Sequence, residues 1–313
     1  MQMKSSALTG RDLVAALAVV IIWGVNFVIT KFALRDFTPF QLGAARYAIA
    51  LIPFVLFIKP PRVHWKWVVL YGLFQGLGQF GLMFIAIQIG LTTALGSVLL
   101  QTQVFFTALF GFVLLRESAS RQLQFGLVLA ALGLVCFVLN FVQPGASGSG
   151  ASTPLGFVLI LCSAAMWAAS NIVVRRMQKE HPDYSAIALI VWSSAVAVLP
   201  FMALSYFFDS EAARWHWLQA PWTSWLSVVY LSWMATLVGY GLWTMLLKRH
   251  PANKVAPFSL GVPVVGLATG MIVLDEVITP WQWAGTGFLV AALACVMLGG
   301  LLVGKLGGMR SRR

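Results

Sequence analysis

Ionisable side chains are scarce in this chain. Only 10% of its 313 residues are Asp, Glu, Lys or Arg, and it has nine acids and four histidines. All of these acids and histidines lie in short polar stretches or at the edges of long apolar runs. Proton-driven pumps ordinarily carry such groups inside their apolar segments, and an intramembrane hydrolase needs a base beside its nucleophile. The sequence therefore predicts neither a proton relay nor a catalytic site.

Motifs that hold cofactors or metals are missing as well. A complete GxxxxGK[ST] phosphate-binding motif does not occur, which excludes an ATP-driven engine on this chain. The only cysteines, Cys136, Cys162 and Cys295, all lie within apolar runs. We interpret them as small core residues and not as disulfides, metal ligands or nucleophiles. We expect no cofactor, no metal site and no catalytic residues.

Apolar residues, in contrast, are abundant. They make up 60% of the chain, and the mean hydropathy is +0.87, which is more apolar surface than a soluble core can bury. The runs are continuous and not alternating, so they predict transmembrane helices and not a barrel. The net charge of +12 comes from short basic clusters between these runs, and we do not interpret it as a sign of nucleic-acid binding.

A connector rich in Gly, Ser and Pro, residues 142–153, divides the chain almost in half. Five apolar segments on each side are long enough to cross a bilayer, which takes about 20 residues of helix. They are Leu13–Phe32, Thr38–Ile58, Trp67–Gln88, Thr92–Leu115, Gln122–Phe141, Pro154–Val174, Tyr184–Phe208, Trp222–Leu247, Val255–Leu274 and Pro280–Val303. Because five is odd, a second half of the same kind must enter the membrane from the opposite face. The predicted fold is an all-α membrane protein with ten transmembrane helices, arranged as two inverted five-helix repeats, residues 11–141 and 154–303.

The distribution of basic residues predicts the orientation. If the amino terminus is assigned to one face, that face carries seventeen of the 21 Lys and Arg residues. The opposite face carries Lys31, Arg35 and Arg214, and Arg46 lies inside the second segment. By the positive-inside rule both termini are cytoplasmic and the connector is periplasmic.

The two halves also share a sequence motif. Val113–Glu117 (Val-Leu-Leu-Arg-Glu) corresponds to Ile272–Glu276 (Ile-Val-Leu-Asp-Glu) at an offset of 159 residues. At the same offset Gly126 corresponds to Gly285. Several matches in the same order favour an internal repeat.

A ten-helix chain with these acidic motifs and an early intramembrane arginine resembles the EamA-type transporters of the drug/metabolite transporter superfamily, over about residues 11–303. Within that superfamily it is most similar to the YddG-like amino-acid exporters. The resemblance implies a central cavity between two inverted halves, opened alternately to each side of a bacterial inner membrane. It also implies a small metabolite as cargo.

Polar and aromatic residues near the middle of the segments are the candidates for lining that cavity. They are Trp23, Asn26, Arg46, Gln75, Gln79, Gln101, Gln103, Trp167, Asn171, Trp233, Tyr240, Trp243 and Ser259. Gln75 and Gln79 stand four residues apart and so share a helix face. Helix packing is the alternative interpretation of such residues, and we favour it for the glycines around the two glutamines.

Arg46 has two interpretations that the sequence leaves open. A charge inside a membrane span is costly and ordinarily functional, which suggests contact with the substrate. The alternative is that Arg46 braces helix ends or loop carbonyls on the periplasmic side.

Four further residues are interpreted as structural. Glu117 and Glu276 each end a helix, where a carboxylate is poorly placed beside the carbonyl end, so we expect each to cap the amino end of the next helix. Pro257 and Pro263 each remove a backbone donor in the ninth segment, so we expect a kink or an exposed carbonyl there.

These observations predict an inner-membrane transporter that exports small metabolites, most of all amino acids, including aromatic or apolar ones, by alternating access. Efflux of multiple drugs or cationic compounds is the first alternative, and the lack of an intramembrane carboxylate argues against it. A membrane-embedded enzyme or lipid-handling protein is the second. The expected partners are a small-molecule substrate and the lipid bilayer, and not nucleic acid. The sequence leaves the oligomeric state open and is compatible with a monomer.

The predicted topology can be tested with reporter fusions. A reporter fused after Arg313 should score as cytoplasmic, and one inserted at Ser147 should score as periplasmic. A periplasmic carboxy terminus would contradict an even number of spans.

Overall fold

The computed structural model describes residues 9–116, 120–142, 152–250 and 252–310, and these contain helices and loops but no strand. Within them, nine helical runs are long and apolar enough to cross a membrane. A further apolar helix, α2 (Pro39–Val55), has 17 residues. The prediction of an all-helical membrane protein is confirmed.

Helices fill most of both halves. Those before the connector are α1 (Gly10–Ala33), α2, α3 (Trp65–Tyr71), η1 (Gly72–Phe80), α4 (Gly81–Gln88), α5 (Thr93–Leu99), η2 (Leu100–Thr102), α6 (Gln103–Leu115) and α7 (Arg121–Val142). Those after it are α8 (Pro154–Glu180), α9 (Ala186–Phe208), α10 (Glu211–Arg214), η3 (His216–Gln219), α11 (Trp222–Val229), η4 (Tyr230–Val238), α12 (Gly239–Arg249), α13 (Ala252–Val255), η5 (Ala256–Leu260), α14 (Gly261–Val273) and α15 (Pro280–Arg310). Of the connector, the structure describes only Val142, Ser152 and Thr153.

Departures from α-helical geometry occur in the same order on both sides of the connector. The run from α3 to α4 passes through a π-helix, η1, and the run from α11 to α12 passes through another, η4. The following runs each contain a 3₁₀ turn, η2 before α6 and η5 before α14. A π-helical segment is rare in proteins in general but common at functional sites, and a 3₁₀ stretch within a helix often marks a functional hinge. These four segments therefore indicate the part of the bundle where a functional site is expected.

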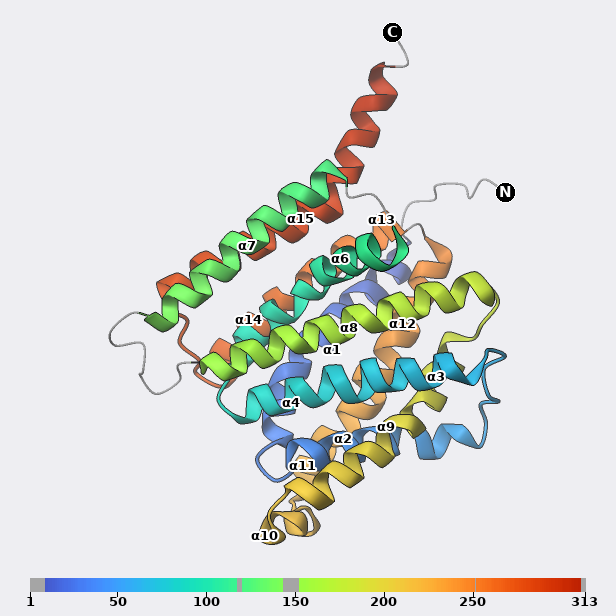
Figure 1. Cartoon of the computed structure of the whole chain (residues 1–313), viewed down its shortest axis with the longest axis vertical. Helices are drawn as coiled ribbons and strands as arrows, with labels where there is room; N and C mark the ends of the chain where they lie inside the picture. Colours follow the sequence, from blue (N-terminus) through green and yellow to red (C-terminus); the bar gives the residue numbers. More distant parts are fainter. Residues whose placement is uncertain (1–8, 117–119, 143–151, 251, 311–313) are drawn as a thin grey trace.

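Helices from the two sides of the connector interleave. In Figure 1, α7 and α15 lie side by side along one edge of the bundle. Elsewhere α2 packs against α9, α1 against α14, and α6 against α8. Each of these pairs takes one helix from either half, so the halves share one bundle.

Glycines allow α7 and α15 to approach closely. A Cβ on Gly126 would lie 2.5 Å from Val296 Cγ2, and one on Gly285 would lie 2.7 Å from Phe137 Cε2. The two contacts are equivalent in the two halves, because Gly126 corresponds to Gly285, and Phe137 to Val296, at the same offset of 159 residues. On η1, Cβ atoms at Gly72 and Gly76 would likewise crowd α9, which confirms the packing interpretation of these glycines.

Glu276 corrects one sequence-based expectation. Its Oε1 accepts a hydrogen bond from the Thr93 backbone N–H (2.7 Å), and its Oε2 accepts from the Ala94 N–H (2.8 Å) and the Thr93 hydroxyl (3.0 Å). The cap therefore serves α5, in the other half, and not the following helix α15. A carboxylate stabilises the positive end of any helix that faces it, and sequence adjacency does not decide which one. Glu117 lies outside the described residues.

The residues just before the two glutamates share an unusual backbone. Arg116 (φ 55°) and Asp275 (φ 52°) are the non-glycine residues with positive φ in the described chain. Arg116 is the C-cap of α6, whereas Asp275 follows the C-cap of α14, Leu274, and the two residues correspond at the offset of 159. The matched motif therefore has a matched backbone geometry at this position.

The two prolines of the ninth segment lie in a 3₁₀ turn and at the start of the helix that follows it. Pro257 lies in the 3₁₀ turn η5, and Pro263 lies in the first turn of α14. The carbonyl of Ser259 in this irregular stretch accepts a hydrogen bond from Gln101 Nε2 (3.3 Å). A side chain of the other half thus satisfies a backbone group that the irregular geometry frees.

Large apolar side chains cover the outside of the bundle. Leu199 is 72% exposed, Phe112 58% and Val14 67%. A soluble surface rarely carries so many contiguous apolar residues, whereas lipid solvates them without cost.

We expect Glu276→Ala to destabilise the protein by about 2 kcal/mol or more, because it leaves two buried backbone N–H groups without an acceptor. Glu276→Gln keeps an acceptor oxygen and should cost less. The measurement is thermal unfolding of the purified protein in detergent. Asp275→Asn is the matched control, since it removes a neighbouring exposed charge and keeps a residue that tolerates positive φ. Equal melting temperatures for Glu276→Ala and Asp275→Asn would contradict the capping role.

Candidate functional site

A cavity of about 540 Å³ lies between the two halves. Residues from both π segments and both 3₁₀ segments line it. Its volume falls within the range of ligand pockets for small molecules.

The cavity runs toward one face of the bundle. It reaches Arg175 near the end of α8, Tyr184 in the α8–α9 loop and Leu247 in the last turn of α12. This is the face where α1 begins, because Arg249 and His250 contact Asp12. In the opposite direction the space is filled by a buried apolar cluster that includes Phe84, Leu91 and Leu95. The cavity therefore extends from the middle of the bundle toward the face that carries the start of α1.

The structure brings together twelve of the thirteen residues predicted to line a cavity. These twelve are Trp23, Asn26, Arg46, Gln75, Gln79, Gln101, Gln103, Trp167, Asn171, Tyr240, Trp243 and Ser259. Trp233 is the exception, because it is not among the lining residues and is 41% exposed. Its indole N–H donates to the Ile49 carbonyl (3.1 Å), so this side chain contacts α2 and not the cavity.

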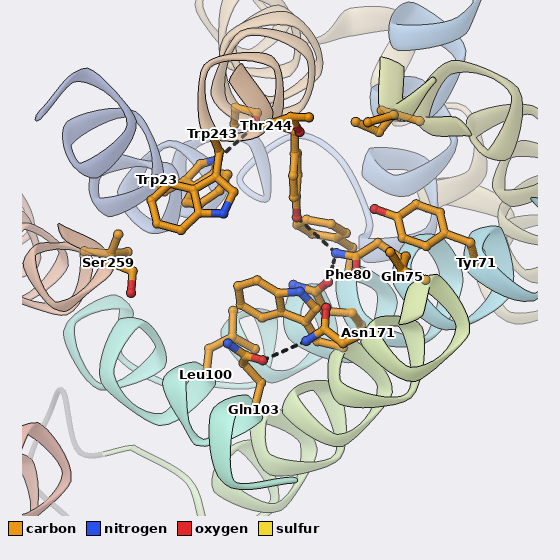
Figure 2. A pocket seen from close by; sticks show the side chains of 18 of the residues that line it. Trp23, Tyr71, Gln75, Phe80, Leu100, Gln103, Asn171, Trp243, Thr244 and Ser259 are labelled. Carbon is orange, nitrogen blue, oxygen red and sulfur yellow. Dashed lines mark hydrogen bonds between the residues drawn. The ribbon is translucent and has the colours of Figure 1, made fainter. Parts of the chain in front are cut away.

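An aromatic cluster forms one wall. The ring of Trp23 lies 5.0 Å from that of Tyr240 and 5.6 Å from that of Trp243, both in tilted arrangements. The indole N–H of Trp23 donates to the Ala235 carbonyl (3.0 Å) in the π segment η4. Gly239 makes room for this contact, because a Cβ there would lie 2.5 Å from Trp23 Nε1. The cluster joins α1 to the second half, and Figure 2 shows Trp23 and Trp243 side by side.

A second wall carries a hydrogen-bonded chain of polar groups. The Ser170 hydroxyl donates to Gln75 Oε1 (2.6 Å), and Gln75 Nε2 donates to the Tyr240 hydroxyl (3.1 Å) and to Gln79 Oε1. These residues come from α8, η1 and α12. The chain therefore links both halves across the cavity.

A separate polar pair lies on the α6–α8 side (Figure 2). Asn171 Nδ2 donates to Gln103 Oε1 (3.0 Å) and to the Thr107 hydroxyl (3.1 Å). Asn26, on α1, differs from these residues: its buried Oδ1 has no hydrogen-bond partner in the described structure. The cavity thus offers a small number of polar groups within an otherwise apolar and aromatic surface.

Arg46 is almost completely buried, with 1% of its surface exposed. Its Nη2 donates to the Thr236 hydroxyl (3.0 Å), and its guanidinium carbon lies 3.9 Å from the centre of the Phe80 ring. Nε and Nη1 make no hydrogen bond to the described residues. It contacts no loop carbonyl among the described residues, so the alternative interpretation, in which Arg46 braces loops or helix ends, has no supporting contact.

Acidic residues and histidines are absent from the described lining residues. Arg46, Arg175 and several tyrosines are the ionisable groups there. Burial raises the pKa of Tyr184, which lies in the α8–α9 loop, so its hydroxyl stays neutral at physiological pH. Asp12 and His250 form a buried acid–histidine contact (2.9 Å) between the start of α1 and the end of α12, and neither residue lines the cavity.

Several residues that line the cavity were not predicted from the sequence. Tyr71, Phe80, Thr244 and Met297 all contribute to the wall. Their types are common on lipid-facing and core surfaces of membrane helices, so no sequence signal separates them. The sequence also did not predict the π-helical geometry of η1 and η4, which changes the helix face on which the following residues lie.

Comparison with known proteins agrees with this architecture. The model of the EamA-like transporter family matches residues 11–139 and 154–298. A probable amino-acid metabolite efflux pump of Escherichia coli K12 is 34% identical over 284 residues, which cover 90% of this chain and 93% of that protein. The threonine/homoserine exporter RhtA of Escherichia coli K12 is 29% identical over 255 residues, which cover 80% of this chain and 78% of the relative.

A solved crystal structure shares the fold, with a TM-score of 0.56 and 17% identity over 92% of this chain and 96% of the other. The family model covers most of both halves, and the efflux pump is similar over nearly its whole length. The family expected from the sequence motifs is confirmed. The chain belongs to the EamA-like transporter family.

Proposed function

We propose that this transporter exports amino acids across a bacterial inner membrane by alternating access through the cavity between its halves. The observation that carries the proposal is the cavity itself, whose apolar and aromatic walls accept varied side chains while a few polar groups orient a common head group. The names of the two similar proteins, an amino-acid metabolite efflux pump and a threonine/homoserine exporter, support the same substrate class.

The proposed architecture is ten spans in two inverted repeats, with both termini in the cytoplasm. Matched π and 3₁₀ segments in the two halves support it, as does the matched pair of contacts at Gly126 and Gly285. The family match to residues 11–139 and 154–298 gives the boundaries of the two repeats independent support. With the cytoplasmic face at the start of α1, the cavity of this conformation extends toward the cytoplasm.

Efflux of cationic compounds is the alternative substrate class. A cation in a low-dielectric cavity binds best beside an anionic partner. The described lining residues supply no carboxylate, and they include two arginines, Arg46 and Arg175. The electrostatics of the cavity therefore favour substrates that carry a negative group.

We expect Gln79→Ala and Trp167→Ala each to lower amino-acid transport by at least about fivefold, which corresponds to one lost hydrogen bond or ring contact of about 1 kcal/mol. The measurement is counterflow of labelled amino acids in liposomes, normalised to the amount of protein in the membrane.

The matched controls are Gln88→Ala and Trp233→Ala, which change the same residue types outside the cavity. Both controls should transport at the wild-type rate. Normal transport by both cavity variants would show that these residues do not contribute to the substrate site.

Transport should be driven by the substrate gradient and not by protons. No acid or histidine lines the described cavity, and a proton carrier must be exposed to each side in turn. Liposomes should therefore equilibrate an amino acid down its gradient. A pH difference imposed without a membrane potential should not concentrate it, and accumulation several-fold above equilibrium would disprove this mechanism.

A further inference from the structure

Arg46 is a buried cation without a counter-ion. Arg46 lies in the middle of α2, whereas the described acids lie at helix ends or in loops. The described ion pairs involve Asp12 and Glu180, and Arg46 takes part in neither. In the described structure the positive charge of Arg46 therefore faces the rings of Phe80 and Phe84 and one hydroxyl group, and no carboxylate.

Most of the hydrogen-bonding capacity of this side chain is unused. A guanidinium carries five N–H donors, and the described structure satisfies one of them, through Thr236. Nε and Nη1 are buried from solvent and unpartnered. A buried, unpaired charge costs several kcal/mol, so a protein that retains one normally pairs it in another state or with a ligand.

The position of Arg46 connects it to the two irregular segments. Phe80 is the last residue of the π segment η1, and Thr236 lies in the π segment η4. Arg46 therefore sits between equivalent segments of the two halves, where it also lines the cavity. An anion that binds here contacts the surfaces at which the two halves meet.

We propose that Arg46 forms the subsite that receives the carboxylate of the substrate. The inference rests on the proposed export function and names the side chain that binds the carboxylate shared by all amino-acid substrates. A carboxylate in the cavity supplies acceptors to the unused N–H groups and neutralises the guanidinium. Because only 1% of the Arg46 surface is exposed, the wall at Phe80 must shift by a side-chain movement to admit the anion. An amine or amide analogue gains no such ion pair.

The test uses substrate analogues on the wild-type protein. Liposomes exchange labelled L-leucine or L-threonine, and the competitors are the unlabelled amino acid, its amide and its N-acetyl derivative. The N-acetyl derivative keeps the carboxylate and loses the ammonium group. We expect the amides to compete at least about 30-fold more weakly than the amino acids, because removal of one partner of a buried charge pair has at least that effect. The N-acetyl compounds should compete better than the amides.

Variants of Arg46 assign the preference to this side chain. In Arg46→Gln the acid and the amide should compete within about threefold of each other, since the charge that separates them is gone. Arg46→Lys keeps a point charge and should keep part of the preference. Thr236→Val is the matched control, because it removes the hydrogen-bond partner of Arg46 but not the charge, and it should keep the full preference.

Each outcome decides the proposal. Equal competition by acids and amides in the wild-type protein would show that Arg46 is a structural residue, while amino-acid exchange itself still stands. A preference that persists in folded Arg46→Gln would assign the carboxylate to another group. If Arg46→Gln does not fold, the analogue series on the wild type and on Arg46→Lys decides. Failure of the folded wild-type protein to exchange either amino acid would contradict the proposed function and this inference together.

Discussion

Lipid offers no hydrogen bonds, so every irregular stretch of backbone within the described bundle needs partners from the protein itself. Two of the π and 3₁₀ segments, η4 and η5, meet this constraint beside the cavity. Gln101 donates to the Ser259 carbonyl of η5, and Trp23 donates to the Ala235 carbonyl of η4. Cavity-lining side chains thus stabilise the irregular backbone as well as shaping the space. A substitution at such a residue changes the helix geometry and the cavity together.

The sequence predicted the large-scale features because each depends on composition over many residues. The apolar segments follow from long hydrophobic runs, and twelve of the thirteen predicted cavity residues follow from the rarity of polar groups within these runs. The family follows from the resemblance that the acidic motifs and the early intramembrane arginine carry. The misses depend on three-dimensional neighbours. Trp233 and Tyr240 lie in one continuous apolar run, and only the turn of η4 and α12 sends the first outward and the second inward. Glu276 caps α5 because the chain brings residue 93 next to it, and no local pattern encodes that contact.

The chain is a transporter, not an enzyme, and its cavity has the features that this role requires. Aromatic and apolar walls adapt to different side chains, while the Gln75 chain and the Asn171 pair give fixed polar positions. Both halves contribute to each of these features. A relative movement of the halves therefore alters the shape and the polarity of the site at once.

The cap between Glu276 and α5 limits the movement that the proposed alternating access requires. Its three hydrogen bonds include two from buried backbone N–H groups, and breaking such bonds costs about 1–3 kcal/mol for each group left unsatisfied. A metabolite bound with millimolar affinity contributes only about 4 kcal/mol in all. A ligand of that affinity cannot both uncap α5 and reorganise the bundle. In the proposed alternating-access cycle we therefore expect the start of α5 and the loop that follows α14 to move together, with any hinge elsewhere along these helices.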